Sequence, residues 1–160
     1  MRTDIKMALF MQVLTEKIVK MLHLSKDIEF VTETLNLTND FLIGKTICPD
    51  LLYSHLENLD EEDILTYFDL DKVSKSEVWT CIADAVAYIC LLDYEEVGEE
   101  YLPETIESVD EGTLIEFFDN YKKCLQAFED LSEFQKEILN DSRVDLESDE
   151  VKEKYQFLFP

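Results

Sequence analysis

Residues 74–96 read SKSEVWTCIADAVAYICLLDYEE and decide the fold class of this chain. An almost continuous apolar run extends from Val78 to Leu92, with one acid, Asp84, inside it. The pattern Ser-x-x-Glu that begins at Ser74 is typical of a capping box, which starts a helix. Gly98 follows the run, and Gly is favoured just past the end of a helix. The stretch therefore predicts a helix that is buried on most of its surface.

This helix suits a protein core better than a membrane or a catalytic site. Its apolar run of about 15 residues would be roughly 22 Å long, against about 30 Å of membrane hydrocarbon. Asp84 has no acid, His or nucleophile at a matching spacing, which argues against catalysis. We expect Asp84 at the one wet edge of the helix, with a buried, hydrogen-bonded carboxylate as the alternative. The predicted core residues of the helix are Trp79, Ile82, Val86 and Ile89.

The rest of the chain also indicates helices. Only 3 Gly and 3 Pro occur in 160 residues, well below the usual frequencies, so we expect few turns and long elements. Apolar residues recur at helical spacing in residues 4–23, 25–42, 49–58, 61–70, 110–139 and 148–159, with Ser25 and Asp60 as possible caps and a possible break near Ser132. Residues 98–109 are expected to form a loop or short turn. We predict one compact all-helical domain over residues 1–160, with about six to eight helices around a buried central helix near residues 75–96.

The charge of the chain limits its partners. The formal net charge is −23, from 37 acids and 14 bases. Direct binding to nucleic acid or to an anionic membrane is disfavoured, because both need cations on the protein. The acids are also distributed unevenly along the chain. They are concentrated in residues 46–121, where Lys72 and Lys75 are the only bases. Because such a segment repels itself, we interpret it as a surface for a basic protein partner, with solubility as the alternative.

No pattern for catalysis or for a cofactor stands out. The four Cys have no zinc-type spacing, which favours reduced thiols in the cytoplasm, and the N-terminus lacks the pattern of a signal peptide. Asp69 and Asp71 start like a calcium loop, but the later ligands of that motif are missing. His23 and His55 are isolated. We therefore expect a non-enzymatic protein without metal or cofactor; an enzyme with an unrecognised acidic metal site is the rival hypothesis.

The segment YEEVGEEYLPETIESVDEG, residues 94–112, is the predicted contact surface. It places aromatic and apolar residues within a ring of acids, which suits docking on a basic, partly apolar cleft. The alternative is a merely exposed acidic connector. The predicted partner-binding residues are Glu95, Glu96, Glu99, Glu100, Tyr101, Glu104, Glu107, Asp110 and Glu111.

Residues 77–111, EVWTCIADAVAYICLLDYEEVGEEYLPETIESVDE, resemble the family numbered six in the Imm series of bacterial immunity proteins. The resemblance rests on Trp79 at the head of an apolar helix, on DAVAYI with Asp84 and Tyr88, and on YLPE within an acidic segment. It extends over roughly residues 40–125. The family is all-helical and belongs to polymorphic toxin systems, which include contact-dependent inhibition systems.

The resemblance implies a cytoplasmic antidote that binds the C-terminal domain of a cognate toxin and has no chemistry of its own. Many toxins of such systems are nucleases, whose basic clefts an acidic protein can cover. The alternative is an acidic, nucleic-acid-mimicking regulator or adaptor without a toxin partner. The sequence carries no signal for an oligomeric state.

Overall fold

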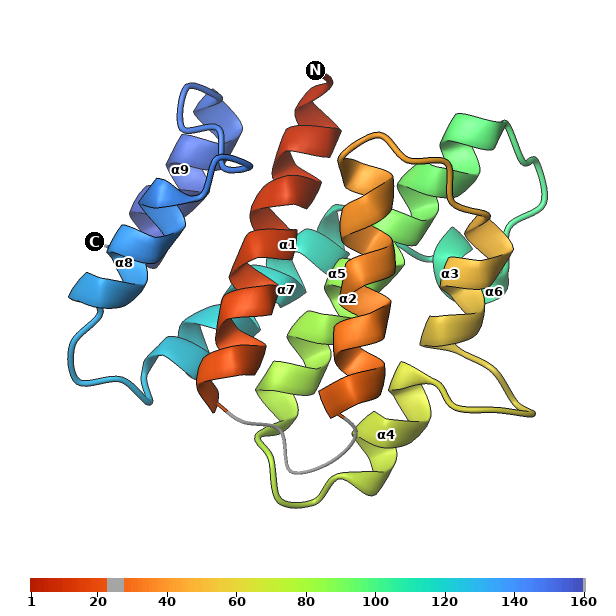
Figure 1. Ribbon diagram of the computed structural model, residues 1–160, viewed down its shortest axis with the longest axis horizontal. Helices are drawn as coiled ribbons and strands as arrows, with labels where there is room; N and C mark the ends of the chain where they lie inside the picture. The colour runs from red at the N-terminus through yellow and green to blue at the C-terminus, as the bar shows by residue number, and fades with distance from the viewer. Residues whose placement is uncertain (23–27, 160) are drawn as a thin grey trace.

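The computed structural model describes residues 1–22 and 28–159, and these residues form nine helices and no strand (Figure 1). The helices are α1 (Thr3–Leu22), α2 (Ile28–Leu42), α3 (Pro49–Leu56), α4 (Ile64–Leu70), α5 (Ser76–Val97), α6 (Glu104–Glu107), α7 (Glu111–Leu125), α8 (Ser132–Asn140) and α9 (Asp149–Leu158). The predicted all-helical fold is confirmed. The helices outnumber those expected because residues 104–107, expected in a loop or short turn, form α6.

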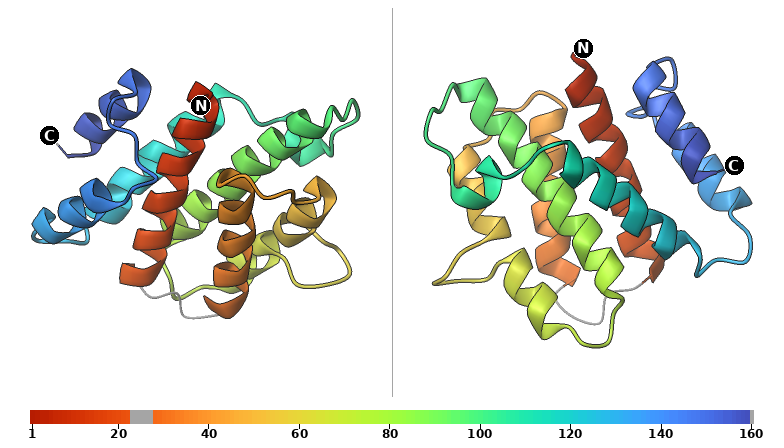
Figure 2. Two further views of the ribbon diagram at one scale, coloured as in Figure 1. Left: turned by 45° about the horizontal axis from the view of Figure 1, so that its top comes forward. Right: turned by 180° about the vertical axis from the view of Figure 1, so that it is seen from behind.

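Helix α5 lies at the centre of the molecule. It contacts α1, α2, α3, α4, α6 and α7. The antiparallel helices α1 and α2 cover one side of α5, and α7 runs alongside it in the opposite direction on the other (Figures 1 and 2). Helices α8 and α9 pack against α1 and α7 at the far side from α3 and α6. This arrangement explains why α5 is apolar around most of its circumference.

The start of α5 is held by Asp71 rather than by the predicted capping box. Trp79, which is completely buried, donates from Nε1 to Asp71 Oδ2 at 2.9 Å. Asp71 Oδ1 accepts the backbone N–H groups of Val73 and Ser74. The helix starts at Ser76 after Lys75, whose side chain makes no capping hydrogen bond. The prediction of a cap at Ser74 is therefore wrong, because Asp71 draws Ser74 into the preceding turn.

Three other core residues of α5, Ile82, Val86 and Ile89, are also completely buried. They pack within the apolar interior that α5 shares with the surrounding helices.

Helix α4 is capped by Asp63, not by Asp60. The Asp63 carboxylate accepts the backbone N–H of Thr66 at 2.6 Å and that of Asn58 at 2.5 Å. Asp60 lies in the exposed connection before it, so the predicted cap was three residues early. Ser25 and His23 lie outside the described residues.

The connection between α8 and α9 is tied to α1 and α2 by Arg143. Its guanidinium donates to Glu16 Oε2 at 2.6 Å, to Asn39 Oδ1 at 2.7 Å and to Asp141 Oδ2 at 2.8 Å. Tyr121 of α7 also donates to the Leu14 carbonyl of α1 at 2.8 Å. These contacts join the C-terminal helices to the helical body.

Within the described residues, no helix is both long enough and apolar enough to cross a bilayer.

Candidate functional site

The segment from residue 95 to 111, here named the acidic loop, leaves α5 through a tight reversal. Gly98 has a φ of +75°, a left-handed conformation that favours Gly. Its N–H bonds to the Glu95 carbonyl, and the Glu99 N–H bonds to the Tyr94 carbonyl. The chain then passes through α6, whose Ile106 is completely buried. The acidic loop is therefore held in place by the turn at Gly98 and by the buried side chain of Ile106.

The acidic loop holds exposed charge with little compensation. All nine residues predicted to contact a partner are exposed: Glu95, Glu96, Glu99, Glu100, Tyr101, Glu104, Glu107, Asp110 and Glu111. Among the described residues they take part in one ion pair, between Arg2 Nη2 and Glu95 Oε2 at 3.9 Å. Tyr101 is 86% exposed and offers an aromatic contact between the acids. A basic partner would find here both charge and an apolar anchor.

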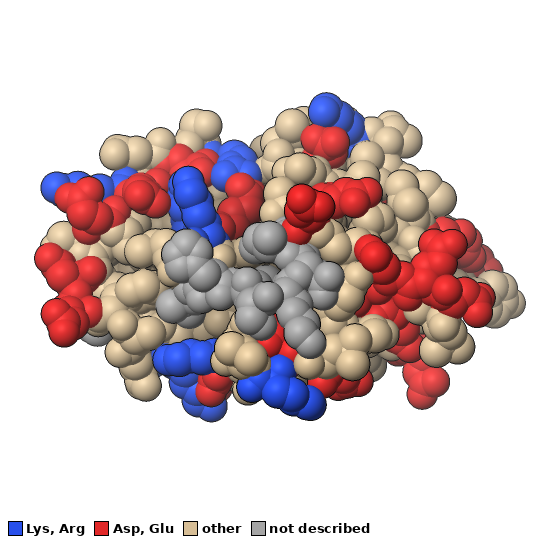
Figure 3. Space-filling view, turned by 60° about the horizontal axis from the view of Figure 1, so that its bottom comes forward, with Lys and Arg blue, Asp and Glu red and all other residues tan. Residues whose placement is uncertain are grey.

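The fold adds a second acidic segment to this surface. Thr105 of α6 donates from Oγ1 to Glu57 Oε2 at 2.6 Å, which joins the acidic loop to the end of α3. Beyond Glu57 the chain exposes Asp60, Glu61 and Glu62, together with Leu59, which is 98% exposed. Asp and Glu cover the end of the molecule that holds α3 and α6, at the right of Figure 3, where this view shows no Lys or Arg.

We name this combined area, the acidic loop with Leu59, Asp60, Glu61 and Glu62, the acidic surface. Only the helix packing brings its two segments together, so their contact could not be predicted from the sequence. The sequence signal for the second segment was an apolar Leu followed directly by Asp60, Glu61 and Glu62.

Next to the acidic loop, Asp84 and Glu116 face each other across α5 and α7. They line a cleft of about 230 Å³ with Thr105, Ser108 and Thr113. Burial, together with the neighbouring carboxylate of Glu116, raises the pKa of Asp84 to about 8. Asp84 Oδ2 is buried and has no hydrogen-bond donor among the described residues. Asp84 is half-buried and borders this cleft, so the expected position at an exposed edge of α5 is confirmed in part, with α7 covering its Oδ2 atom.

Asp84 is mostly protonated at pH 7, but its surroundings do not suggest catalysis. No His, Cys, Lys or Arg is among the residues that line the cleft. The described chain also has no group of three or more His, Cys, Asp or Glu side chains placed to hold a metal ion. His55 bonds through Nδ1 to Thr34 Oγ1 at 2.9 Å and stacks on Phe30, so its contacts are those of a packed side chain.

The described residues thus combine an all-helical fold with an acidic surface whose acids make one ion pair, to Arg2. The family model described as Immunity protein Imm6 matches residues 6–124 of this chain, so the chain belongs to the Imm6 immunity protein family. Immunity proteins protect against a cognate toxin, and such a toxin is the partner that membership implies. No curated protein and no solved structure matched the chain. The matched residues include the whole acidic surface, whereas α8 and α9 lie beyond them.

Proposed function

We propose that this protein is a cytoplasmic antidote that binds the C-terminal domain of a polymorphic or contact-dependent toxin through the acidic surface. The toxin domain is basic and of the nuclease class, and the antidote covers its cleft without any chemistry of its own. The observation that carries the proposal is that all eight acids predicted in the acidic loop are exposed. Within the described residues, only one of them, Glu95, forms an ion pair. Family membership supplies the toxin as the kind of partner.

The charge distribution suits fast capture of a basic protein. A nuclease cleft must be positive to hold phosphates, and complementary charge can raise association rates to about 10⁸–10⁹ M⁻¹s⁻¹ at low salt. Leu59 and Tyr101 project from among the acids and can fill apolar parts of such a cleft. Charge would then set the rate of capture, and these two side chains would slow dissociation.

The proposal is tested by reversing three acids of the acidic loop: Glu99→Lys, Glu100→Lys and Glu104→Lys. The test uses the C-terminal domain of a polymorphic toxin whose gene lies beside the gene of this protein. We expect association at low salt to slow by about 10- to 1000-fold, with loss of protection in cells that express the toxin. Surface plasmon resonance at several salt concentrations measures the rates, and a growth assay measures protection.

The matched control reverses three exposed acids of the opposite end: Glu129→Lys, Glu147→Lys and Glu153→Lys. It changes the net charge equally, so a specific surface predicts that it keeps near-parental binding. Equal losses in both variants would contradict a local binding surface. Inhibition of several unrelated nucleases by the parent protein would favour a nucleic-acid mimic over an antidote for one toxin.

A further inference from the structure

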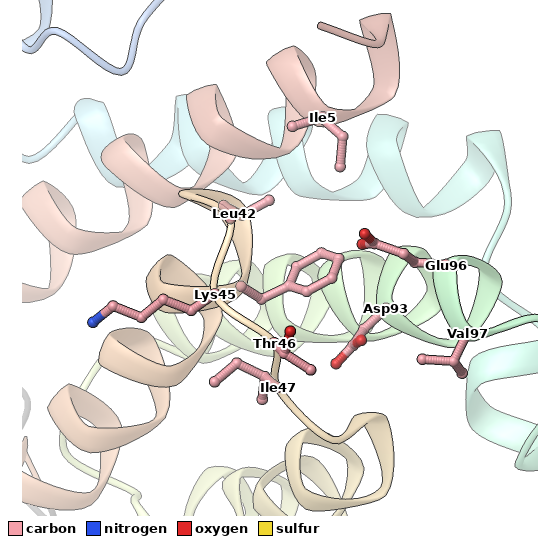
Figure 4. Close-up of a pocket in the computed structure, with 10 residues that line it drawn as sticks. Ile5, Leu42, Lys45, Thr46, Ile47, Asp93, Glu96 and Val97 are labelled. Carbon is pink, nitrogen blue, oxygen red and sulfur yellow. The ribbon is translucent and has the colours of Figure 1, made fainter.

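A cleft of about 250 Å³ opens on the other side of α5 from the Asp84 cleft (Figure 4). It lies between α1, the connection from α2 to α3 and the last turns of α5. Its walls are mostly apolar and include Ile5, Phe41, Leu42, Ile47 and Val97. An engineered cavity of about 150 Å³ already admits benzene, so the space is large enough for a long side chain. Through Glu96 the cleft borders the acidic loop.

Asp93 lines this cleft, and we name it the Asp93 cleft. The residue is 2% exposed, and its Oδ2 atom is buried without a hydrogen-bond donor among the described residues. Burial and the nearby charge of Glu96 raise the pKa of Asp93 to about 6, so its carboxylate is mostly ionised at pH 7.5. A buried carboxylate normally has a cation or hydrogen-bond donors as partners. Among the described residues, the Asp93 Oδ2 atom has neither a cation nor a hydrogen-bond donor as its partner.

The neighbouring cations of the chain do not supply that partner. Lys45 lines the cleft, but its Nζ bonds to Asp40 Oδ1 at 3.0 Å and its side chain points away from Asp93 in Figure 4. Arg2 pairs with Asp4 and Glu95. In the same figure, Asp93 extends toward Thr46, and Glu96 extends toward α1. The two carboxylates therefore present negative charge inside apolar walls.

We propose that the Asp93 cleft receives an arginine side chain of the partner protein. The guanidinium pairs with Asp93 and Glu96, and the methylene groups lie along Ile5, Ile47 and Val97. Arginine fits better than lysine because its planar, weakly hydrated group forms two parallel hydrogen bonds and tolerates apolar surroundings. Arginine is also enriched among the residues that dominate interface energies. The role in partner binding rests on the proposed function, but the cation site itself does not.

The first experiment uses a small probe instead of the toxin. The full ¹⁵N-labelled chain is titrated with n-propylguanidinium chloride at pH 7.5 and constant ionic strength, and amide shifts are followed by NMR. We expect saturable shifts in residues 44–47 and 93–97, with a Kd on the order of millimolar. Asp93→Asn should weaken binding by about 10-fold or more, because a charged hydrogen bond is lost. The matched control Glu99→Gln, in the acidic loop but outside the cleft, should bind like the parent.

A second variant keeps the test valid if Asp93→Asn does not fold. Val97 is 56% exposed at the rim, so Val97→Trp can block the cleft while Asp93 stays in place. This variant should also lose saturable binding. Binding that survives both changes would overturn the cation site. Tighter binding of n-butylammonium than of n-propylguanidinium would overturn the choice of arginine.

Binding measurements with the toxin then distinguish this inference from the proposed function. Asp93→Asn should weaken toxin binding by about 10- to 100-fold, mainly through faster dissociation. If the chain binds guanidinium but no toxin, the proposed function fails and the cation site stands. If the toxin binds Asp93→Asn as tightly as the parent, the cleft has no part in partner binding and this inference fails.

Discussion

Asp84 and Asp93 are two acids of α5 that each have one buried oxygen without a hydrogen-bond donor among the described residues. Their pKa values rise to about 8 and about 6, because burial disfavours the ionised form and a neighbouring Glu adds negative charge. In the unfolded chain the pKa of an Asp is about 3.9. The native state thus holds protons that the unfolded state releases, so these residues make the protein less stable as pH rises from about 4 to 8.

Asp84→Asn should remove much of this pH dependence. The Asn side chain stays neutral and can donate to Glu116, so at pH 8 the variant should exceed the parent in unfolding free energy by about 2 kcal/mol or more, since one pKa unit is worth about 1.4 kcal/mol. Urea denaturation at pH 5, 6, 7 and 8 measures the slope. Glu107→Gln, at an exposed acid of α6, should keep the parental slope. A parental slope in Asp84→Asn as well would refute the assignment.

At the scale of one element, α5 depends on a side chain that lies before it in the chain. Asp71 is 6% exposed, and its hydrogen bonds within the described residues include two from the turn at Val73 and Ser74 and one from the Trp79 indole. It thereby fixes both the turn and the largest buried side chain of the helix. The Asp-x-Asp pattern that resembles the start of a calcium loop therefore has a structural role at its second Asp.

Asp71→Ala should destabilise the fold by about 2–4 kcal/mol, because buried donors lose a charged acceptor. The fluorescence of Trp79, the only Trp, should also change, since its Nε1 loses its partner. Asp69→Ala, at an exposed acid two residues earlier, is the control and should stay within about 0.5 kcal/mol. Equal stability of the two variants would show that the Asp71 contacts contribute little.

At the scale of the whole molecule, the net charge of −23 opposes compactness. Eight side-chain ion pairs occur among the described residues, and they involve Arg2, Lys6, Lys17, Lys45, Lys136 and Arg143. None of these cations comes from the segment between α3 and α7. The acidic surface is consequently a region where the fold tolerates repulsion that a bound basic partner would relieve.

Salt should therefore act in opposite directions on stability and on binding. Between 10 mM and 500 mM NaCl the Tm should rise by several degrees, because screening weakens repulsion between the acids. Association with the toxin should become slower over the same range. Differential scanning calorimetry and stopped-flow fluorescence measure the two effects. A Tm that falls with added NaCl would mean that the ion pairs outweigh the repulsion.

The central helix, the exposed acids and the family could be predicted from local sequence. The apolar run before Gly98 determined a buried central helix, because a helix that is apolar on nearly every side must be covered. The acids of residues 95–111 determined an exposed surface, because unpaired charges stay in water. The resemblance in residues 77–111 pointed to the immunity family that the family model confirms.

Other features depend on which residues the fold brings together. Glu116 faces Asp84 from α7, the acids after Glu57 join the acidic loop through Thr105, and Asp93 is enclosed by α1 and the connection after α2. Helical spacing cannot reveal these neighbours, since they lie far apart in the chain and meet only through packing against α5. The sequence determined the long helices and where the charge lies, but not the short helix α6. The tertiary structure alone decided which carboxylates became buried, because burial is set by the helices that cover them.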